Sequence, residues 1–139
     1  MKLFSATTTI KAPASTIWKI LTDAKNYPAW DPGIHRLEGT IAQGQKITAY
    51  TKLSPRAFPV KVTEFVPDQQ MTWTGGMPLG LFKGVRTFSL SPKGEGSIEF
   101  TLREEFSGPL LPLFAKTIPD LTKTFEAFVA GLKAHAEGG

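Results

Sequence analysis

The sequence predicts an α+β fold in which an antiparallel sheet of about six to seven strands is covered by a long C-terminal helix. Two observations predict this fold. Between residues 45 and 106, short segments of alternating polarity are separated by turns rich in proline and glycine. Between residues 110 and 132, apolar residues recur at steps of three and four, which is the spacing of one buried helix face.

The N-terminal part of the chain adds a strand, a short helix and a second strand. Residues 4–11 alternate apolar and polar side chains, as a half-buried strand does. Pro13 follows, and proline is favoured in the first turn of a helix because its missing N–H needs no partner there. We expect that helix to end near Thr22. Residues 23–33 are expected to form a short helical turn that leads into a strand at residues 34–38.

The middle of the chain has the pattern of a meander of hairpins. Its expected strands span residues 48–53, 58–66, 71–75, 84–91 and 97–106. Centring each connecting loop predicts the cross-strand pairs Ala49–Val62, Glu64–Trp73, Trp73–Arg86 and Phe88–Phe100. This register gathers the large apolar residues on one face and most Thr, Ser and Lys residues on the other. The sheet is therefore expected to bury one face and expose the other.

The C-terminal segment carries its apolar residues as a single stripe. They are Leu110, Phe114, Ile118, Leu121, Phe125, Phe128 and Leu132. Pro119 lies within the stripe and removes the backbone hydrogen bond to Ala115, which kinks or breaks a helix. Because the stripe keeps its phase across the proline, we expect one kinked helix. Most of these residues are expected to pack as core, and some to line a pocket.

Three ionisable residues, Glu64, Arg86 and Glu104, fall on the predicted apolar face. A charge inside a protein is costly unless it is paired or hydrated. In one interpretation, Arg86 stacks on Trp73 and orients a carboxylate, phenolate or carbonyl group of a ligand. In the other, the three charges satisfy one another and hold the strands in register. The sequence leaves both interpretations open.

Two further residues are candidates for the mouth of a cavity. His35, near the start of the second strand, is either a general acid or base, or a hydrogen-bonded residue at a strand end. Trp30 either overhangs the entrance or anchors the turn in which it lies. The predicted ligand-binding set is Trp30, His35, Glu64, Trp73, Arg86, Phe88, Phe100, Glu104, Phe114, Ile118, Leu121 and Phe125. No residue matches a catalytic motif, so no catalytic residue is assigned.

Composition and charge exclude several classes of function. With 139 residues, the chain is expected to form a single domain over residues 1–139. A net charge of +4 from scattered lysines and arginines argues against nucleic-acid binding. The chain has no cysteine, no metal-site spacing and no phosphate-binding glycine loop, so we expect no metal and no cofactor. Without a signal peptide or a membrane-spanning run, we expect a cytoplasmic protein, monomeric or homodimeric.

Several short motifs carry a resemblance to a known superfamily. They are Ile10-Lys11-Ala12-Pro13-Ala14, Tyr27-Pro28-Ala29-Trp30-Asp31-Pro32, Trp73-Thr74-Gly75 and Glu104-Glu105-Phe106-Ser107-Gly108. Together with the order of the elements, they make the chain resemble the SRPBCC superfamily, in the branch of START-like and polyketide cyclase/dehydrase-like proteins. The resemblance implies a helix-grip fold, in which a curved sheet surrounds the C-terminal helix and an apolar cavity lies between them.

The resemblance implies three possible functions. The main expectation is binding or transport of a small, mostly apolar ligand, such as a lipid, a sterol or an aromatic polyketide-like molecule. The first alternative is a polyketide cyclase/dehydratase-type enzyme that uses Glu64, Glu104, His35 or Arg86. The second is a protein-assembly module like those related to carbon monoxide dehydrogenase, which predicts an exposed apolar patch around residues 77–82.

Overall fold

The computed structural model describes residues 2–138, and seven strands within that range form one antiparallel sheet. Its spatial order is β1-β7-β6-β5-β4-β3-β2, so the first strand pairs with the last. The strands are β1 (Lys2–Ile10), β2 (Ile34–Glu38), β3 (Lys46–Thr51), β4 (Ala57–Val66), β5 (Gln70–Gly76), β6 (Lys83–Pro92) and β7 (Ile98–Ser107). The predicted meander and the strand count of the predicted sheet are confirmed.

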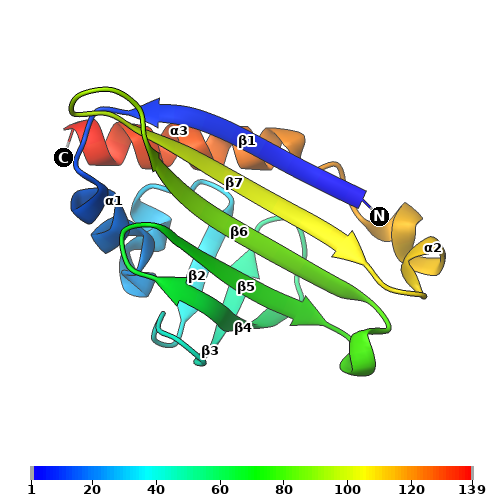
Figure 1. Cartoon of the computed structure of the whole chain (residues 1–139). Coiled ribbons are helices and arrows are strands. Elements are labelled where there is room, and N and C mark those ends of the chain that lie inside the picture. Colours follow the sequence, from blue (N-terminus) through cyan, green and yellow to red (C-terminus); the bar gives the residue numbers. More distant parts are fainter. Residues whose placement is uncertain (1, 139) are drawn as a thin grey trace.

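Helices cover one face of this sheet and both of its ends. The long helix α3 (Thr122–Gly138) lies along β1 and β7 on the concave side (Figure 1). The short helices α1 (Ala14–Leu21) and η1 (Ala24–Ala29) connect β1 to β2 at one end of the molecule. At the other end lie η2 (Pro78–Gly80), α2 (Leu111–Phe114) and η3 (Ala115–Thr117). This is the helix-grip arrangement predicted from the sequence.

The predicted faces of the sheet are correct although most predicted pairs are displaced. Trp73 pairs with Arg86 as predicted, but Ala49 pairs with Phe58 and Phe88 pairs with Leu102. These displacements are by two or four residues. Because side chains alternate with a period of two, an even displacement leaves every residue on its predicted face.

Glu64 is the exception, and its predicted inward orientation is wrong. A β-bulge lies between Val62 and Glu64, so Val62 pairs with Trp73 while Glu64 pairs with Thr72. A bulge inserts one extra residue and thereby reverses the faces that follow it. Glu64 is consequently exposed on the convex face, where its carboxylate accepts a hydrogen bond from the side chain of Gln70. The inward position passes to the next residue, Phe65, whose ring packs 5.3 Å from that of Trp18.

The predicted single kinked helix is also wrong, because the chain breaks around Pro119. Ile118, the residue before the proline, has an extended conformation with φ −78° and ψ 117°. Proline disfavours the helical conformation of the residue that precedes it, and this effect ends the preceding helical segment here. A new helix starts at Thr122, whose N–H donates to the Asp120 carboxylate at 3.0 Å. The apolar stripe survives the break, since Leu121, Phe125, Phe128 and Leu132 are all buried.

The core is densest where α3 crosses the sheet near η1. The ring centroids of Trp73 and Phe88 lie 4.6 Å apart, and the Phe128 ring is 6.0 Å from Phe88 and 6.1 Å from Phe100. Such offset and edge-on contacts stabilise aromatic clusters beyond their burial of apolar area. Phe88 and Phe100 are 0% exposed, so this half of the concave face is filled by side chains.

Candidate functional site

The concave face is filled at one half and partly accessible at the other. The accessible half comprises inward-facing side chains of β3, β4, β6 and β7 that are half-buried or exposed. We call it the open half, and its members are Ala49, Thr51, Phe58, Val60, Arg86, Glu104 and Phe106. Phe58 is 43% exposed although it faces the same side as the fully buried Val62. The helix α3 covers β1 and β7, which leaves the inner surface of β3 and β4 less covered.

An ion pair lies at the boundary between the two halves. Arg86 and Glu104 are directly opposite on β6 and β7, and the Arg86 Nε donates to Glu104 Oε1 at 2.6 Å. Their side chains are 28% and 14% exposed. The guanidinium carbon lies 5.1 Å from the centre of the Phe125 ring, a cation–π distance. Arg86 therefore stacks on Phe125 and not on Trp73, as one interpretation of the sequence had it.

The ion pair leaves hydrogen-bond donors unused. Within residues 2–138, Arg86 has Glu104 as its one hydrogen-bond partner, and that bond engages Nε. A guanidinium carries five N–H groups in a fixed fork, so the two terminal nitrogens remain available. The pair is neutral as a whole, and it presents donors to the open half.

Two buried indoles add to this surplus of donors. Trp30 and Trp73 are 6% and 5% exposed, and the Nε1 of each is buried without a hydrogen-bond partner among the described residues. An unpaired buried donor costs about 1–3 kcal/mol. Trp73 is the cross-strand neighbour of Arg86, so both side chains project from the same face. This neighbourhood is rich in donors.

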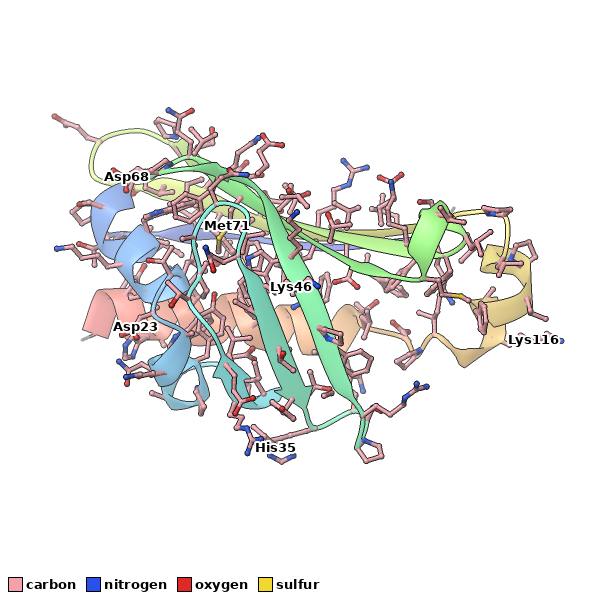
Figure 2. All side chains as sticks on the ribbon, turned by 90° about the horizontal axis from the view of Figure 1, so that it is seen from below. Asp23, His35, Lys46, Asp68, Met71 and Lys116 are labelled. Atoms are coloured by element: carbon pink, nitrogen blue, oxygen red, sulfur yellow. The ribbon has the colours of Figure 1, made fainter. Side chains whose placement is uncertain are left out.

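The other predicted residues lie at separate places. His35 is exposed on β2 and points away from the sheet (Figure 2). It lines an open hollow of about 260 Å³ together with residues 50–56 of the β3–β4 connection. The ring of Trp30 packs 4.7 Å from Tyr27 and 4.9 Å from Phe128, and so anchors η1 to α3. Phe114 and Ile118 are half-buried.

The sequence analysis missed Asp31 as a candidate. Asp31 is 7% exposed and its Oδ1 accepts a hydrogen bond from the Gly33 N–H at 3.0 Å. Burial raises the pKa of this carboxyl group, and the Gly33 hydrogen bond and the charge of Arg86 oppose that rise. The residue was visible in the Pro-Ala-Trp-Asp-Pro segment. Nothing in the alternation of polarity indicated its burial, because the segment is not a strand.

We predict that Asp31→Asn stabilises the protein at neutral pH. Asparagine keeps the oxygen that accepts from Gly33 but carries no charge to desolvate. Because the folded-state pKa is raised, ionisation of Asp31 costs stability as the pH rises through that pKa. The gain should therefore be present near pH 7 and vanish below the ordinary pKa of 3.8, where both states are protonated. Thermal denaturation at both pH values measures it.

The exposed Glu95, in the β6–β7 loop, provides the control for this prediction. Glu95→Gln should leave the denaturation temperature unchanged at both pH values, since an exposed carboxylate is solvated in both states. A loss of stability in Asp31→Asn near pH 7 would contradict the prediction.

Within residues 2–138, no three His, Asp or Glu side chains are grouped closely enough to hold a metal ion. None of the helices in that range is both long and apolar enough to cross a membrane.

Comparison with solved structures shows the fold of the chain. It is similar to a START superfamily protein from Mycobacterium smegmatis, with 20% identity, coverage of 96% of each chain and a TM-score of 0.66. It is also similar to an aromatase/cyclase from Streptomyces sp. R1128, with 13% identity, coverage of 97% and 93%, and a TM-score of 0.74. A third similar structure is the Aha1 dimer from Colwellia psychrerythraea, with 19% identity, coverage of 99% and 97%, and a TM-score of 0.73.

The fold and the half-open concave face define a START-like protein of the SRPBCC superfamily, as the sequence motifs indicated. More specifically, the chain belongs to the family described as polyketide cyclase / dehydrase and lipid transport, whose pattern matches residues 1–137. A search of curated protein sequences finds no match.

Proposed function

We propose that the protein binds and carries a small, mostly apolar molecule in the open half of its concave face. The observation that carries this proposal is Arg86, whose terminal guanidinium nitrogens have no partner among residues 2–138 and which lies among apolar side chains. An apolar surface with a few convergent polar groups is the usual form of a small-molecule site. The family description, which includes lipid transport, supports the same class of ligand.

The polar groups indicate what the ligand carries. The charge of Arg86 is balanced by Glu104, so a carboxylate at this place would approach an anion at close range. A neutral acceptor, such as a carbonyl or ether oxygen, receives a hydrogen bond from the guanidinium without that repulsion. The indole N–H of Trp73, next to Arg86, favours an acceptor as well. We therefore propose a neutral ligand with a carbonyl group, such as a ketone or an ester of a long chain.

The arrangement of the ionisable groups favours a carrier over an enzyme. A cyclase or dehydratase needs a group that moves protons and faces the bound substrate. Of the predicted candidates, Glu64 and His35 are exposed away from the open half, and Glu104 is paired with Arg86. The buried Asp31 is the remaining carboxyl group on the inner side. An enzymatic function would therefore depend on Asp31, and Asp31→Asn would abolish it.

Ligand binding is tested with a panel comprising a fatty acid, its methyl ester, a sterol and an aromatic ketone. Quenching of Trp fluorescence reports binding because Trp73 lies beside Arg86. We expect the ester or the ketone to bind more tightly than the fatty acid. In Ala49→Phe a large ring occupies the open half, so affinity should fall by about tenfold or more.

The matched control is Thr48→Phe, which adds a ring on the opposite face one residue away. It should leave affinity unchanged. Failure of every panel member to bind, together with no co-purifying molecule in native mass spectra, would refute the proposal. Equal losses in the two variants would place the site elsewhere.

A further inference from the structure

One end of the molecule presents apolar side chains to solvent. The segments η2 and α2 lie there beside the start of β1 (Figure 1), and the Leu110 N–H donates to the Leu81 carbonyl at 2.9 Å. Leu79 is 95% exposed, Leu113 is 70% exposed and Met77 is 40% exposed. We call these three residues the leucine tip. A cluster of large apolar side chains on projecting segments is unusual on a protein surface and indicates a contact with another surface.

The backbone at Leu79 strengthens this inference. Its φ of 61° and ψ of 20° lie in the left-handed region, which disfavours a branched side chain and favours glycine. The side chain is almost fully solvent-exposed, so packing within the chain does not offset this strain. Folding would proceed better with glycine at this position. A leucine held there is suited to a contact outside the chain.

The charges around the leucine tip are of one sign. Lys83 follows η2, Lys116 follows α2, and Lys2 begins β1 with its Nζ 3.5 Å from the Ala115 carbonyl. The segments 77–83 and 108–117 contain no Asp or Glu. Lys116 projects outward at the same end as η2 (Figure 2). Lysines around exposed apolar side chains match the anionic headgroups and apolar interior of a lipid surface.

The leucine tip is also connected to the open half. Phe82 follows η2, and its ring centroid lies 6.1 Å from Phe106 and 5.3 Å from Phe114. Phe106 belongs to the open half and is near Gly84, where a Cβ atom would lie 3.2 Å from its ring. A row of aromatic side chains thus joins the tip to the neighbourhood of Arg86.

We propose that the leucine tip docks into an anionic membrane surface, with Leu79 and Leu113 inserted between headgroups and the lysines in contact with phosphates. A ligand would pass between the membrane and the open half along Phe82 and Phe106. Docking itself stands on the leucine tip, whereas this exchange route rests on the proposed function. The alternative occupant of the tip, a protein surface, is an outcome of the test.

The test is flotation of the full chain with vesicles of phosphatidylcholine alone or mixed with phosphatidylglycerol. We expect binding to the mixed vesicles, weakened by salt because surface charges are screened. Leu79→Gly relieves the backbone strain, so it should fold at least as stably as the wild type while vesicle binding falls by about tenfold. Leu113→Gln should weaken binding to a similar extent. The control Leu53→Gln, at an exposed leucine of the β3–β4 connection, should bind as the wild type does.

Three results would overturn the proposal. The first is a wild-type chain that does not float with anionic vesicles, and the second is Leu79→Gly binding as tightly as the wild type. The third is a wild-type dimer in size-exclusion chromatography that Leu79→Gly dissociates, because the tip would then bind a second copy. Fluorescence titration of Leu79→Gly with the ligand panel keeps the two proposals apart: ligand binding in solution should persist when vesicle binding is lost.

Discussion

Arg86→Met is expected to lower the free energy of unfolding by about 2–3 kcal/mol. The methionine retains much of the contact with Phe125 but leaves the carboxylate of Glu104 without its cation. Breaking a fully buried pair costs about 3–5 kcal/mol, and an exposed pair contributes about 1 kcal/mol or less. With side-chain exposures of 28% and 14%, this pair lies between these limits and closer to the buried one. Denaturant titration measures the loss.

Two further variants identify the cause of that loss. In Arg86→Met/Glu104→Gln no charge is left unpaired, so stability should return to within about 1 kcal/mol of the wild type. In Arg103→Met the change is on the neighbouring residue, which faces the convex side and pairs with Glu105 at 3.5 Å. That exposed pair should contribute about 0.5 kcal/mol or less. A double variant no more stable than Arg86→Met would show that the loss comes from packing and not from the orphaned charge.

The same variant separates structure from ligand binding. Arg86→Met should reduce affinity for the ester or ketone that the wild type binds, since the guanidinium is the proposed donor. A large loss of stability with unchanged affinity would leave the ion pair as a purely structural feature. The ligand would then be held by apolar contacts alone.

The faces of the sheet were predictable because they depend on alternation, which survives an error of two residues in a loop. Glu64 was not predictable, since Thr63 fits the polar face and nothing in the sequence marks the bulge beside it. The break before α3 had a signal in Pro119. The continuous apolar stripe argued against it, but the stripe is also compatible with two segments packed on one core. Local backbone sterics were the better guide there.

The division of the concave face into a filled and an open half was beyond the reach of sequence reasoning. Phe88 and Phe106 are both inward-facing aromatic residues on neighbouring strands, yet one is fully buried and the other is half-buried. The difference depends on where α3 crosses the sheet, which alternation within a strand does not encode. The predicted set therefore mixed core residues such as Phe100 with side chains of the open half such as Arg86. That the latter bind a ligand stays a prediction.

The position of α3 depends on Gly131, and Gly131→Ala is expected to destabilise the protein by about 3 kcal/mol. A Cβ atom at this position would lie 1.9 Å from the Trp30 carbonyl oxygen, far inside contact distance. Within a helix, Gly→Ala ordinarily stabilises by about 1 kcal/mol, so the sign of the effect is itself diagnostic. The helix must shift away from η1, which would also loosen the packing of Phe128 against Trp30. Denaturant titration followed by circular dichroism measures the change.

Gly138→Ala provides the matched control, because Gly138 lies in the same helix with nothing within 4 Å of a Cβ atom. Its effect should be neutral or slightly stabilising, by less than about 1 kcal/mol. If Gly131→Ala were as stable as Gly138→Ala, α3 would not approach Trp30 as closely as the structure has it. The filled half would then be wider than described, and part of the predicted ligand set that now forms the core, Phe88 and Phe100 first, would become accessible to a ligand. The opposite result, a large loss confined to Gly131, fixes α3 on the core and leaves the open half as the accessible part of the concave face.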